Sequence, residues 1–439
     1  MNRGVTIIGL GYIGLVNAVM LASYHRHVIG YDIDKEKIVQ LKQGISPIDE
    51  DGVQILLAES HHNLRFTSND KDAIRPNDVI IVAVDTPIGK DGKLDMSYFR
   101  DAIESIAKNA IQDTYVVILS TVPIGTNRKV KKYLEEHSKY KFEVITHPEF
   151  LSQGRALKDV TSPSRVVIGT DSAKGEALIR KVYDEILIKK VPILVTSPEN
   201  AEIIKYASNS YLAMRISFIN EIARICERVG GNIDDVYLGI SLDPRVGLNY
   251  FKPGVGFGGG YLPKDTDGLY KESIAAGEPA YLAKAAIESN DRQTEFFIGK
   301  IFARFKSITN MKVAVLGLGY KGGTEDIRNS PAIPVVRALL ERYAEIYAYD
   351  SIAEENFRKL FSRHTHIHYM DYVKDALDKA DFVVILSDSA EFKKLTLDDF
   401  KKMKHPIIFD GRNLYKPESM VGVEYHSVGR PTVEKKKGK

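Results

Sequence analysis

One pattern occurs twice in this chain: an apolar strand, a glycine-rich turn, and a second strand that ends in an acidic residue. The first copy runs from Val5 through a glycine motif at residues 9–14 to Asp32. The second copy runs from Val313 through a glycine motif at residues 317–322 to Asp350. This strand–turn–strand pattern is typical of doubly wound α/β domains. The repeat therefore indicates an internal duplication of fold, which need not be a duplication of function.

The rest of the chain predicts a three-part organisation. Further apolar stretches predict strands at residues 79–84, 115–119, 142–145, 166–168, 193–195, 382–386 and 407–409. Helical patterns separate several of these strands, which favours mostly parallel sheets with helices on both faces. From residue 199 to about 304 the pattern is helical, interrupted by a glycine-rich loop at 253–260. We predict an α/β fold with two Rossmann-like doubly wound domains, residues 1–196 and 305–432, joined by a central helical domain at 197–304 and followed by a basic tail at 433–439.

Composition excludes several classes of protein. The net charge of +3 comes from dispersed basic residues and gives little support to nucleic-acid binding. No apolar run reaches membrane-spanning length, and the chain enters its first strand at Val5 without a cleavable leader, so a cytoplasmic protein without a membrane partner is expected. The single cysteine, Cys226, excludes an intramolecular disulfide and lies on an apolar helical stripe, where core packing is expected. No metal site is expected.

The first glycine motif has the context of a dinucleotide fingerprint. It follows a strand, begins a helix and precedes an acid at the tip of the next strand. The glycines allow a tight turn and a close approach of the pyrophosphate to the helix N-terminus. Asp32 can accept both ribose hydroxyls and repels a 2′-phosphate, so NAD is favoured over NADP. The alternative is a packing turn that binds no nucleotide. The residues expected at this cofactor site are Gly9, Gly11, Tyr12, Ile13, Gly14 and Asp32.

The second glycine motif carries cations. Lys321 and Arg328 stand beside backbone amides, an arrangement that suits a phosphate-bearing ligand. Taken alone, the two cations can equally be ordinary surface charge.

Ordered landmarks along the chain resemble the UDP-glucose/GDP-mannose dehydrogenase family, and most closely its UDP-glucose 6-dehydrogenase branch. The resemblance covers nearly the whole chain. The landmarks are Thr86-Pro87, Ser120 to Thr126, Pro148 to Leu151, Lys205 to Asn209, Ile216 to Glu221, Asp243 to Gly247, Pro253 to Asp265 and Asp410 to Asn413.

The resemblance implies an activity and a set of roles. Members of the family use NAD to oxidise the 6-hydroxyl of a UDP-sugar twice, through a thioester on a cysteine, and are expected to be homodimers built on the central helices. The first domain would then bind NAD and the last would bind UDP. By position, the cofactor site would add Lys37, Thr86, Thr121, Gln153, Lys264 and Arg328. The substrate site would contain Glu149, Phe150, Leu151, Lys205, Asn209, Arg245, Tyr250, Phe251, Lys252, Pro253, Gly254, Gly258 and Lys321. Proton transfer and oxyanion stabilisation would fall to Thr121, Glu149, Lys205, Asn209 and Asp265.

Three positions depart from the family pattern, and they are expected to cluster at the reacting end of the site. Tyr261 stands where the nucleophilic cysteine is expected, Gln153 replaces a glutamate, and His147 replaces an asparagine. A phenol with a pKa near its usual ~10 is a weak nucleophile at neutral pH and forms no thioester. A site without a thioester also has less need of a carboxylate to hydrolyse one. We hypothesise that the first oxidation survives without the covalent route, with Tyr261 as an acid/base partner whose pKa Lys264 lowers.

Several alternatives stay open from the sequence. The product can be a 6-aldehyde, a 4-keto sugar or a redox-neutral sugar, or an aldehyde hydrate can be oxidised directly to UDP-glucuronate. Tyr261 can instead simply fill the vacated pocket. The chain can also be an inactive sensor of UDP-sugar or NAD, although retention of Glu149, Lys205, Asn209 and Asp265 speaks against a pure binder. A hydroxyacid dehydrogenase similar to 6-phosphogluconate dehydrogenase would share the fold but lacks the 253–265 loop.

Overall fold

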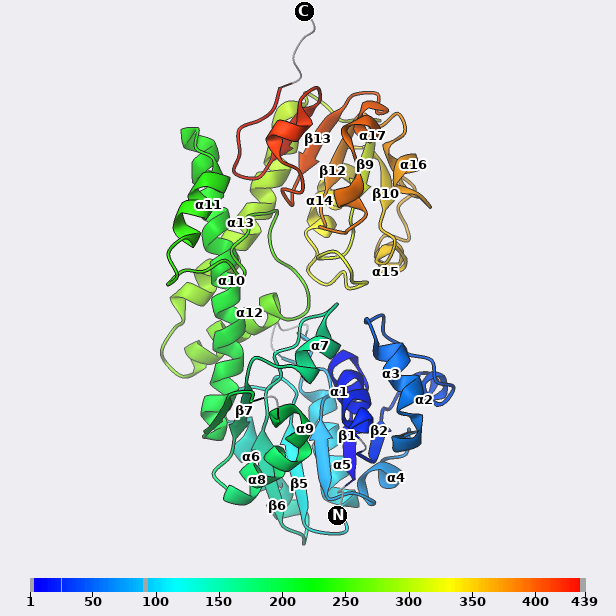
Figure 1. Cartoon of the computed structure of the whole chain (residues 1–439), viewed down its shortest axis with the longest axis vertical. Helices are drawn as coiled ribbons and strands as arrows, with labels where there is room; N and C mark the ends of the chain where they lie inside the picture. The colour runs from blue at the N-terminus through cyan, green and yellow to red at the C-terminus, as the bar shows by residue number, and fades with distance from the viewer. Residues whose placement is uncertain (1–3, 25, 90–93, 189, 435–439) are drawn as a thin grey trace, which may run out of the picture. The chain divides into compact units, whose positions relative to one another are not determined.

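The computed structural model describes residues 4–24, 26–89, 94–188 and 190–434, and its backbone forms two compact units, residues 1–207 and 208–439 (Figure 1). Most of the predicted basic tail, residues 435–439, lies outside the described residues.

The first unit is built on one sheet whose strands follow the order β3-β2-β1-β4-β5-β6-β7-β8. Its first six strands have the 3-2-1-4-5-6 order of a dinucleotide-binding fold. Neighbouring strands pair in parallel, but β6 and β7 pair antiparallel. The strands are β1 (Val5–Ile8), β2 (Val28–Tyr31), β3 (Leu64–Thr67), β4 (Val79–Val82), β5 (Thr114–Ile118), β6 (Phe142–Thr146), β7 (Val166–Gly169) and β8 (Ile193–Thr196). The helices are α1 (Tyr12–Ser23), α2 (Lys35–Lys42), α3 (Val53–Glu59), η1 (His61–Asn63), α4 (Asp70–Ile74), α5 (Ser97–Asn109), α6 (Thr126–His137), α7 (Ala156–Thr161), α8 (Ala173–Val182) and α9 (Asp184–Leu187).

Alternation along the strands produces two cores, one on each face of this sheet. In β4, Val79 and Ile81 join one cluster, whereas Ile80 and Val82 join the other, because successive side chains of a strand point to opposite faces. The first cluster includes apolar residues of α1, α2, α3 and α8, and the second includes those of α5 and α6. Helices therefore cover both faces of the sheet, as a buried parallel sheet requires.

The second unit contains a second sheet with the strand order β11-β10-β9-β12-β13-β14, which is again 3-2-1-4-5-6 and parallel throughout. Its strands are β9 (Lys312–Leu316), β10 (Glu345–Tyr349), β11 (Ile367–Tyr369), β12 (Phe382–Ile385), β13 (Ile407–Asp410) and β14 (Glu424–Ser427). The helices around this sheet are α14 (Ala332–Leu340), α15 (Glu354–Leu360), α16 (Val373–Leu377), η2 (Phe392–Lys394), α17 (Leu397–Lys401) and η3 (Pro417–Met420).

Long helices precede this second sheet, namely α10 (Pro198–Val229), α11 (Ile233–Ser241), α12 (Leu262–Ala275) and α13 (Tyr281–Arg304). Helix α10 begins in the first unit and ends in the second. Within the second unit, Arg224 of α10 donates hydrogen bonds to Ser289 and Gln293 of α13. Ile219 and Cys226 of α10 also share a core with strands β9 and β12. The helical segment and the second sheet thus fold around one apolar core.

The predicted fold class is confirmed: two mostly parallel, Rossmann-like sheets accompany a central helical segment. The predicted strands match β1, β4 to β10, β12 and β13 to within two residues at each end, and the second strand, predicted only to end at Asp32, ends one residue earlier as β2. Three further strands, β3, β11 and β14, were not predicted, and all three lie at sheet edges. Among the described residues, no helix is both long enough and apolar enough to span a bilayer.

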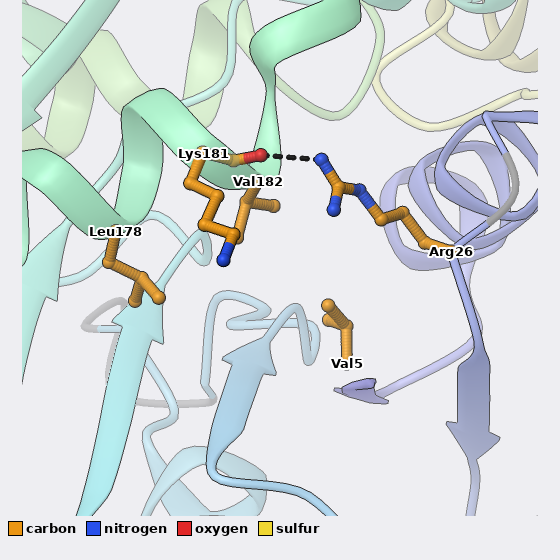
Figure 2. A pocket seen from close by; sticks show the side chains of 5 residues that line it. All are labelled: Val5, Arg26, Leu178, Lys181 and Val182. Atoms are coloured by element: carbon orange, nitrogen blue, oxygen red, sulfur yellow. Dashed lines mark hydrogen bonds between the residues drawn. The ribbon is translucent and has the colours of Figure 1, made fainter. Parts of the chain in front are cut away.

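A small pocket lies at the amino-terminal end of β1, at the opposite end of this strand from the glycine motif (Figure 2). It is lined by Val5, Arg26 and three residues of α8. The guanidinium of Arg26 donates a 2.6 Å hydrogen bond to the carbonyl oxygen of Lys181 and pairs with Asp184 at 2.6 Å. These contacts fasten the turn before β2 to α8 and α9, so the pocket is part of the scaffold and separate from the glycine motif.

Candidate active site

The glycine motif between β1 and α1 has the shape that a dinucleotide requires. Gly9 has a φ of +91°, and a Cβ there would lie 2.8 Å from the carbonyl oxygen of Ala83. A Cβ at Gly14 would collide with the carbonyl oxygen of Gly9 at 1.8 Å. A Cβ at Gly11 would meet only the Asp85 carboxylate, at 3.8 Å, among the described atoms. Gly9 and Gly14 are therefore required by the turn itself, whereas Gly11 leaves open space above the backbone.

The amino end of α1 is available to an anion. Gly11 is its N-cap, and within the described chain no side chain caps this helix and no acid occupies its first turn. By contrast, α2, α4 and α8 are capped by Asp34, Asn69 and Ser172. Uncapped N–H groups at a helix N-terminus attract a phosphate. The site thus fits the pyrophosphate of a dinucleotide.

Asp32 lies one residue beyond β2, and its carboxylate bonds to several groups at the carboxyl end of this strand. Its Oδ2 accepts hydrogen bonds from the backbone N–H of Leu10 at 2.8 Å and from Nζ of Lys37 at 2.9 Å. Its Oδ1 accepts from the backbone N–H of Asp34. The structure therefore brings together Asp32, Lys37 and the glycine motif, three of the predicted cofactor elements.

Two predicted cofactor threonines are also neighbours. The Thr86 hydroxyl donates a 2.8 Å hydrogen bond to the carbonyl oxygen of Thr121, and both side chains are buried. The two residues follow β4 and β5, which lie side by side in the sheet. The carboxyl ends of parallel strands are where α/β domains bind their ligands.

Glu149 and Lys205 form a buried ion pair in the first unit. Nζ of Lys205 lies 2.7 Å from Oε1 of Glu149 and 2.6 Å from its carbonyl oxygen, and the two side chains are 5% and 4% exposed. The other carboxylate oxygen of Glu149 accepts from the backbone N–H of Leu151. Burying two charges costs several kcal/mol per ion, so a buried ion pair is weak evidence of a stabilising role.

The segment after Glu149 is held in place by residues far away in sequence. The carboxylate of Glu50 accepts hydrogen bonds from the backbone N–H groups of Gly154 and Ala156, and burial raises the pKa of this carboxyl. The hydroxyl of Tyr12 also accepts from the N–H of Gly154. The buried Gln153 directly precedes these anchored residues. Glu50 is thus a supporting residue that the sequence did not single out.

Phe150 lies beside two cations. The guanidinium of Arg165 stacks 3.6 Å above its ring centre, and Nζ of Lys205 lies 5.6 Å from it. Partial burial lowers the pKa of Arg165.

His147 does not belong with the reacting groups. Its Nδ1 bonds to the carbonyl oxygen of Val167 in β7 at 2.8 Å, and its ring packs 4.9 Å from the ring of Tyr183. Burial lowers the pKa of this imidazole, which is therefore neutral at pH 7. The hypothesis that this departure clusters at the reacting end is wrong for His147, because its ring is occupied in joining β6 to β7.

In the second unit, Asp265 is the centre of another buried cluster. Its fully buried carboxylate accepts a 2.6 Å hydrogen bond from Nδ2 of Asn209 and lies 3.3 Å from Nζ of Lys264. Tyr261 is the N-cap residue of α12, and its carbonyl oxygen accepts from the N–H of Asp265. Tyr261, Lys264 and Asp265 therefore share the first turn of α12, with Asn209 bonded to it.

The glycine loop before Tyr261 is held by side chains from α10 and α13. Asn220 accepts from the N–H of Gly254, and Gln293 donates to the carbonyl oxygen of the same residue. Asn290 bonds both the N–H and the carbonyl of Phe257. Bonds to backbone atoms fix the course of the loop independently of its side chains. These three amides were not predicted as site residues, although Asn220 falls within the landmark at 216–221.

Arg412 joins the loop to the second sheet. Its guanidinium donates to the carbonyl oxygens of Leu386, Gly256 and Tyr320, at 2.7, 3.1 and 2.7 Å. Burial lowers the pKa of this group. Arg412 lies in the landmark 410–413 but was not predicted as a site residue, because sequence alone does not show which strand ends meet.

Three glycines allow the loop to lie against the second glycine motif. A Cβ at Gly258 would meet the carbonyl oxygen of Asn329 at 2.2 Å, and one at Gly259 would meet the ring of Tyr320 at 2.9 Å. A Cβ at Gly260 would lie 2.6 Å from the guanidinium carbon of Arg328. The loop and the 320–329 segment are thus in direct contact.

The second glycine motif repeats the first only in part. Oδ2 of Asp350 accepts from the N–H of Leu318 at 2.8 Å, as Asp32 accepts from Leu10. Helix α1 begins three residues after Gly9, whereas α14 begins only at Ala332, well beyond Gly317. Arg328 in the intervening segment pairs with Asp326, and Lys321 lies near the ring of Tyr320. The fold is duplicated. However, a helix begins directly after the first motif, whereas α14 begins well after the second.

The remaining predicted substrate residues lie before the loop and differ in exposure. Arg245 is exposed and pairs with Asp243, and Lys252 is exposed. Tyr250 is partly exposed and has a φ of +54°, a strained value for a residue with a Cβ. The Phe251 side chain is buried in the core of the second unit, next to the guanidinium of Arg215.

Comparison with known proteins identifies the family to which the chain is similar. Three domain models of the UDP-glucose/GDP-mannose dehydrogenase family match it: the NAD binding domain at residues 3–187, the central domain at 199–292 and the UDP binding domain at 314–417.

Similar proteins cover nearly the full length of the chain. The UDP-glucose 6-dehydrogenase TuaD of Bacillus subtilis is 38% identical over 98% of this chain and 94% of its own length. The UDP-glucose 6-dehydrogenase of Rhizobium meliloti is 39% identical over 97% of this chain and 99% of its own length. The solved structure of a UDP-glucose dehydrogenase from Pyrobaculum islandicum superposes with a TM-score of 0.91 at 31% identity and covers 98% of both chains. With its glycine motif, its buried ion pair and these full-length matches, the chain belongs to the UDP-glucose/GDP-mannose dehydrogenase family of NAD-dependent oxidoreductases.

Proposed function

We propose that this protein oxidises a UDP-hexose of the UDP-glucose type by hydride transfer to NAD, without a cysteine thioester. The buried Glu149–Lys205 pair is the observation that carries the proposal, because an expensive pair of charges is retained at the carboxyl end of the cofactor-binding sheet. The full-length relatives named UDP-glucose 6-dehydrogenase support the choice of substrate.

The chemistry needs a proton acceptor for the hydroxyl and donors for the developing alkoxide. NAD, held at the glycine motif and Asp32, would supply the hydride acceptor. The ammonium group of Lys205 and the amide of Asn209 can donate hydrogen bonds to an oxyanion, and the carboxylate of Asp265 can take up a proton. We propose that these groups, together with Thr121 and Glu149, serve one reaction, in which an alcohol loses a hydride and a proton and becomes a carbonyl.

A thioester route lacks its nucleophile. The single cysteine of the chain, Cys226, is buried in a helical core, and burial raises the pKa of its thiol. A thiol with a raised pKa supplies little thiolate. We propose that Tyr261, in the first turn of α12 with Lys264 and Asp265, takes part in proton transfer instead.

The substitution that tests the proposal removes the ion pair as a unit. The double variant Glu149→Gln/Lys205→Met leaves no unpaired buried charge, whereas either change alone would. We expect UDP-glucose-dependent NADH formation to fall by roughly 10³-fold or more, while NAD binding persists. Lys132→Met, which removes an exposed lysine of α6, is the matched control. An unchanged rate in the double variant would overturn the proposed role, and binding without turnover of any UDP-hexose by the wild type would favour a sensor.

We also propose a homodimer built on α10. Tyr211, Phe218 and Ile225 recur every seven residues on this helix and are 56, 52 and 50% exposed, and Val229 continues the same face. A contiguous apolar stripe of this kind is typical of an interface between helices. Phe218→Glu is expected to give monomers in sedimentation analysis, whereas Tyr372→Glu, at an exposed tyrosine elsewhere, leaves the assembly unchanged. A dimer that persists in Phe218→Glu would contradict this interface.

A further inference from the structure

The carboxylate of Asp85, a residue that the sequence did not single out, faces the glycine motif between β1 and α1. An ideal Cβ built on Gly11 would lie 3.8 Å from both carboxylate oxygens of Asp85, and no carbon atom of this side chain comes within 4 Å of it. Both oxygens are therefore turned toward the open space above Gly11. The side chain is exposed, and no residue in the described part of the chain donates a hydrogen bond to this carboxylate.

Contacts on either side fix the backbone at Asp85. The N–H of Ala83 donates a 2.8 Å hydrogen bond to the carbonyl oxygen of Ile8 in β1. One residue after Asp85, the hydroxyl of Thr86 is bonded to the carbonyl oxygen of Thr121. Asp85 thus lies between two anchored residues, at the carboxyl end of β4 and beside the glycine motif.

The order of the strands separates the two halves of a bound dinucleotide. Chain order reverses between β1 and β4, and a dinucleotide lies across the sheet at this reversal. Asp32, at the end of β2, suits the ribose of the adenosine half, and the amino end of α1 suits the pyrophosphate. The nicotinamide half then extends over the ends of β4 and β5, which is the side on which Asp85 lies.

A carboxylate at this position either opposes binding or acts as a second ribose ligand. Beside a pyrophosphate, an uncompensated negative charge weakens binding by Coulomb repulsion. The two vicinal hydroxyls of a ribose are hydrogen-bond donors, however, and two carboxylate oxygens can accept both in strong, charge-assisted bonds. Both oxygens of Asp85 face the motif and are available to such donors, which favours the second role.

We propose that Asp85 binds the 2′- and 3′-hydroxyls of the nicotinamide ribose, as Asp32 is expected to bind those of the adenosine ribose. Asp85 is then a specificity residue that favours a dinucleotide over a nucleotide that ends at its phosphates. This role depends on NAD binding by the first unit, whose family model is an NAD binding domain, and is independent of the proposed sugar oxidation.

Titration of the full chain with three ligands, without any sugar, tests this role. ADP carries the pyrophosphate without a second ribose, ADP-ribose adds that ribose, and NAD adds the nicotinamide. Asp85→Ala is expected to raise the dissociation constants of ADP-ribose and NAD by about tenfold or more, because charge-assisted hydrogen bonds are lost. The dissociation constant of ADP is expected to stay the same or to fall, because a nearby negative charge is removed. Isothermal titration calorimetry measures all three constants.

The pattern across the three ligands decides between the roles. Tighter binding of all three by Asp85→Ala would show that the carboxylate only repels the cofactor, and equal weakening of all three would show that Asp85 merely shapes the turn. Loss of affinity for NAD alone would assign the contact to the nicotinamide. Each of these results, and equally an absence of any change, would overturn the proposal.

Two further variants complete the test. Asp85→Asn keeps the size of the side chain and is expected to give the same pattern with a smaller loss, because an amide retains one acceptor oxygen. Asp101→Ala, at an exposed aspartate of α5, is the matched control and should leave all three constants unchanged. If the expected pattern appears but no UDP-hexose is oxidised, the proposed function fails and the role of Asp85 stands.

Discussion

The side-chain amide of Asn209 donates a 2.6 Å hydrogen bond to the carboxylate of Asp265, which is fully buried. Nζ of Lys264 also lies 3.3 Å from this carboxylate. A buried charge depends strongly on each of its partners. The relationship makes Asn209 the residue that orients the Asp265 carboxylate.

Removal of the amide should therefore affect both stability and rate. Asn209→Ala is expected to lower the free energy of unfolding by about 1–3 kcal/mol, because a buried acceptor loses its donor. Asp265→Asn is expected to lower kcat by roughly 10²-fold or more with little change in KM. Denaturant titration and steady-state kinetics measure these effects. Asp267→Asn, which removes a partly exposed carboxylate from the same helix, is the control and should change neither quantity appreciably.

Variants of Asp32 and Asp350 test whether the two glycine motifs share only a fold or also a function. Each accepts a 2.8 Å hydrogen bond from the residue after the first glycine of its motif. We expect Asp32→Asn to raise the KM for NAD by about 10- to 100-fold, because a charged acceptor for the ribose is lost. Asp350→Asn should lower thermal stability but leave the KM for NAD within about twofold. Equal effects of both variants on NAD would contradict the assignment of the cofactor to the first motif.

Cys226 should be dispensable for turnover. Its thiol is buried, and burial raises its pKa, so little thiolate forms at neutral pH. Cys226→Ser is expected to retain NADH formation and to lose about 1 kcal/mol of stability. Iodoacetamide should not inhibit the native enzyme. Rapid inactivation that Cys226→Ser abolishes would show that the thiol takes part in the reaction after all.

A variant of Tyr261 distinguishes an acid/base role of this residue from simple filling of the pocket. Tyr261→Phe keeps the ring and removes the hydroxyl, so a role in proton transfer predicts a loss of roughly 10²- to 10⁴-fold in kcat, whereas a filler predicts almost none. Tyr270→Phe on the same helix is the matched control. Tyr261→Cys restores a nucleophile and is expected to produce uronic acid if the remaining groups suffice. Absence of uronic acid would point to Gln153, the other departure that remains near the proposed site.

The sequence predicted those elements of the fold that a local pattern of apolar residues determines. Strands such as β4 and β12 are continuous apolar runs buried on both faces, and both were predicted within two residues. The edge strands β3, β11 and β14 contain Arg65, His368 and Glu424 among their few residues and bury fewer side chains, so their sequences resemble loops.

The site was predicted less completely, because its supporting contacts join distant segments. Glu149 and Lys205 are 56 residues apart; the family resemblance assigned both to one site, but their direct pairing was not predicted. Arg412 bonds to Gly256 across 156 residues, and nothing in its local sequence indicates that contact. His147 shows the opposite error: it stands next to site residues in the sequence, but its ring bonds to a strand behind them.

The most direct measurement is the number of NADH molecules formed per UDP-glucose consumed at exhaustion, with the product identified by mass spectrometry and NMR. We predict at most one NADH per sugar and a product that carries a carbonyl group or is rearranged, because the site lacks the thiol that holds the aldehyde for a second oxidation. Two NADH per sugar together with UDP-glucuronate would contradict the central claim and would show that a non-covalent route completes the oxidation.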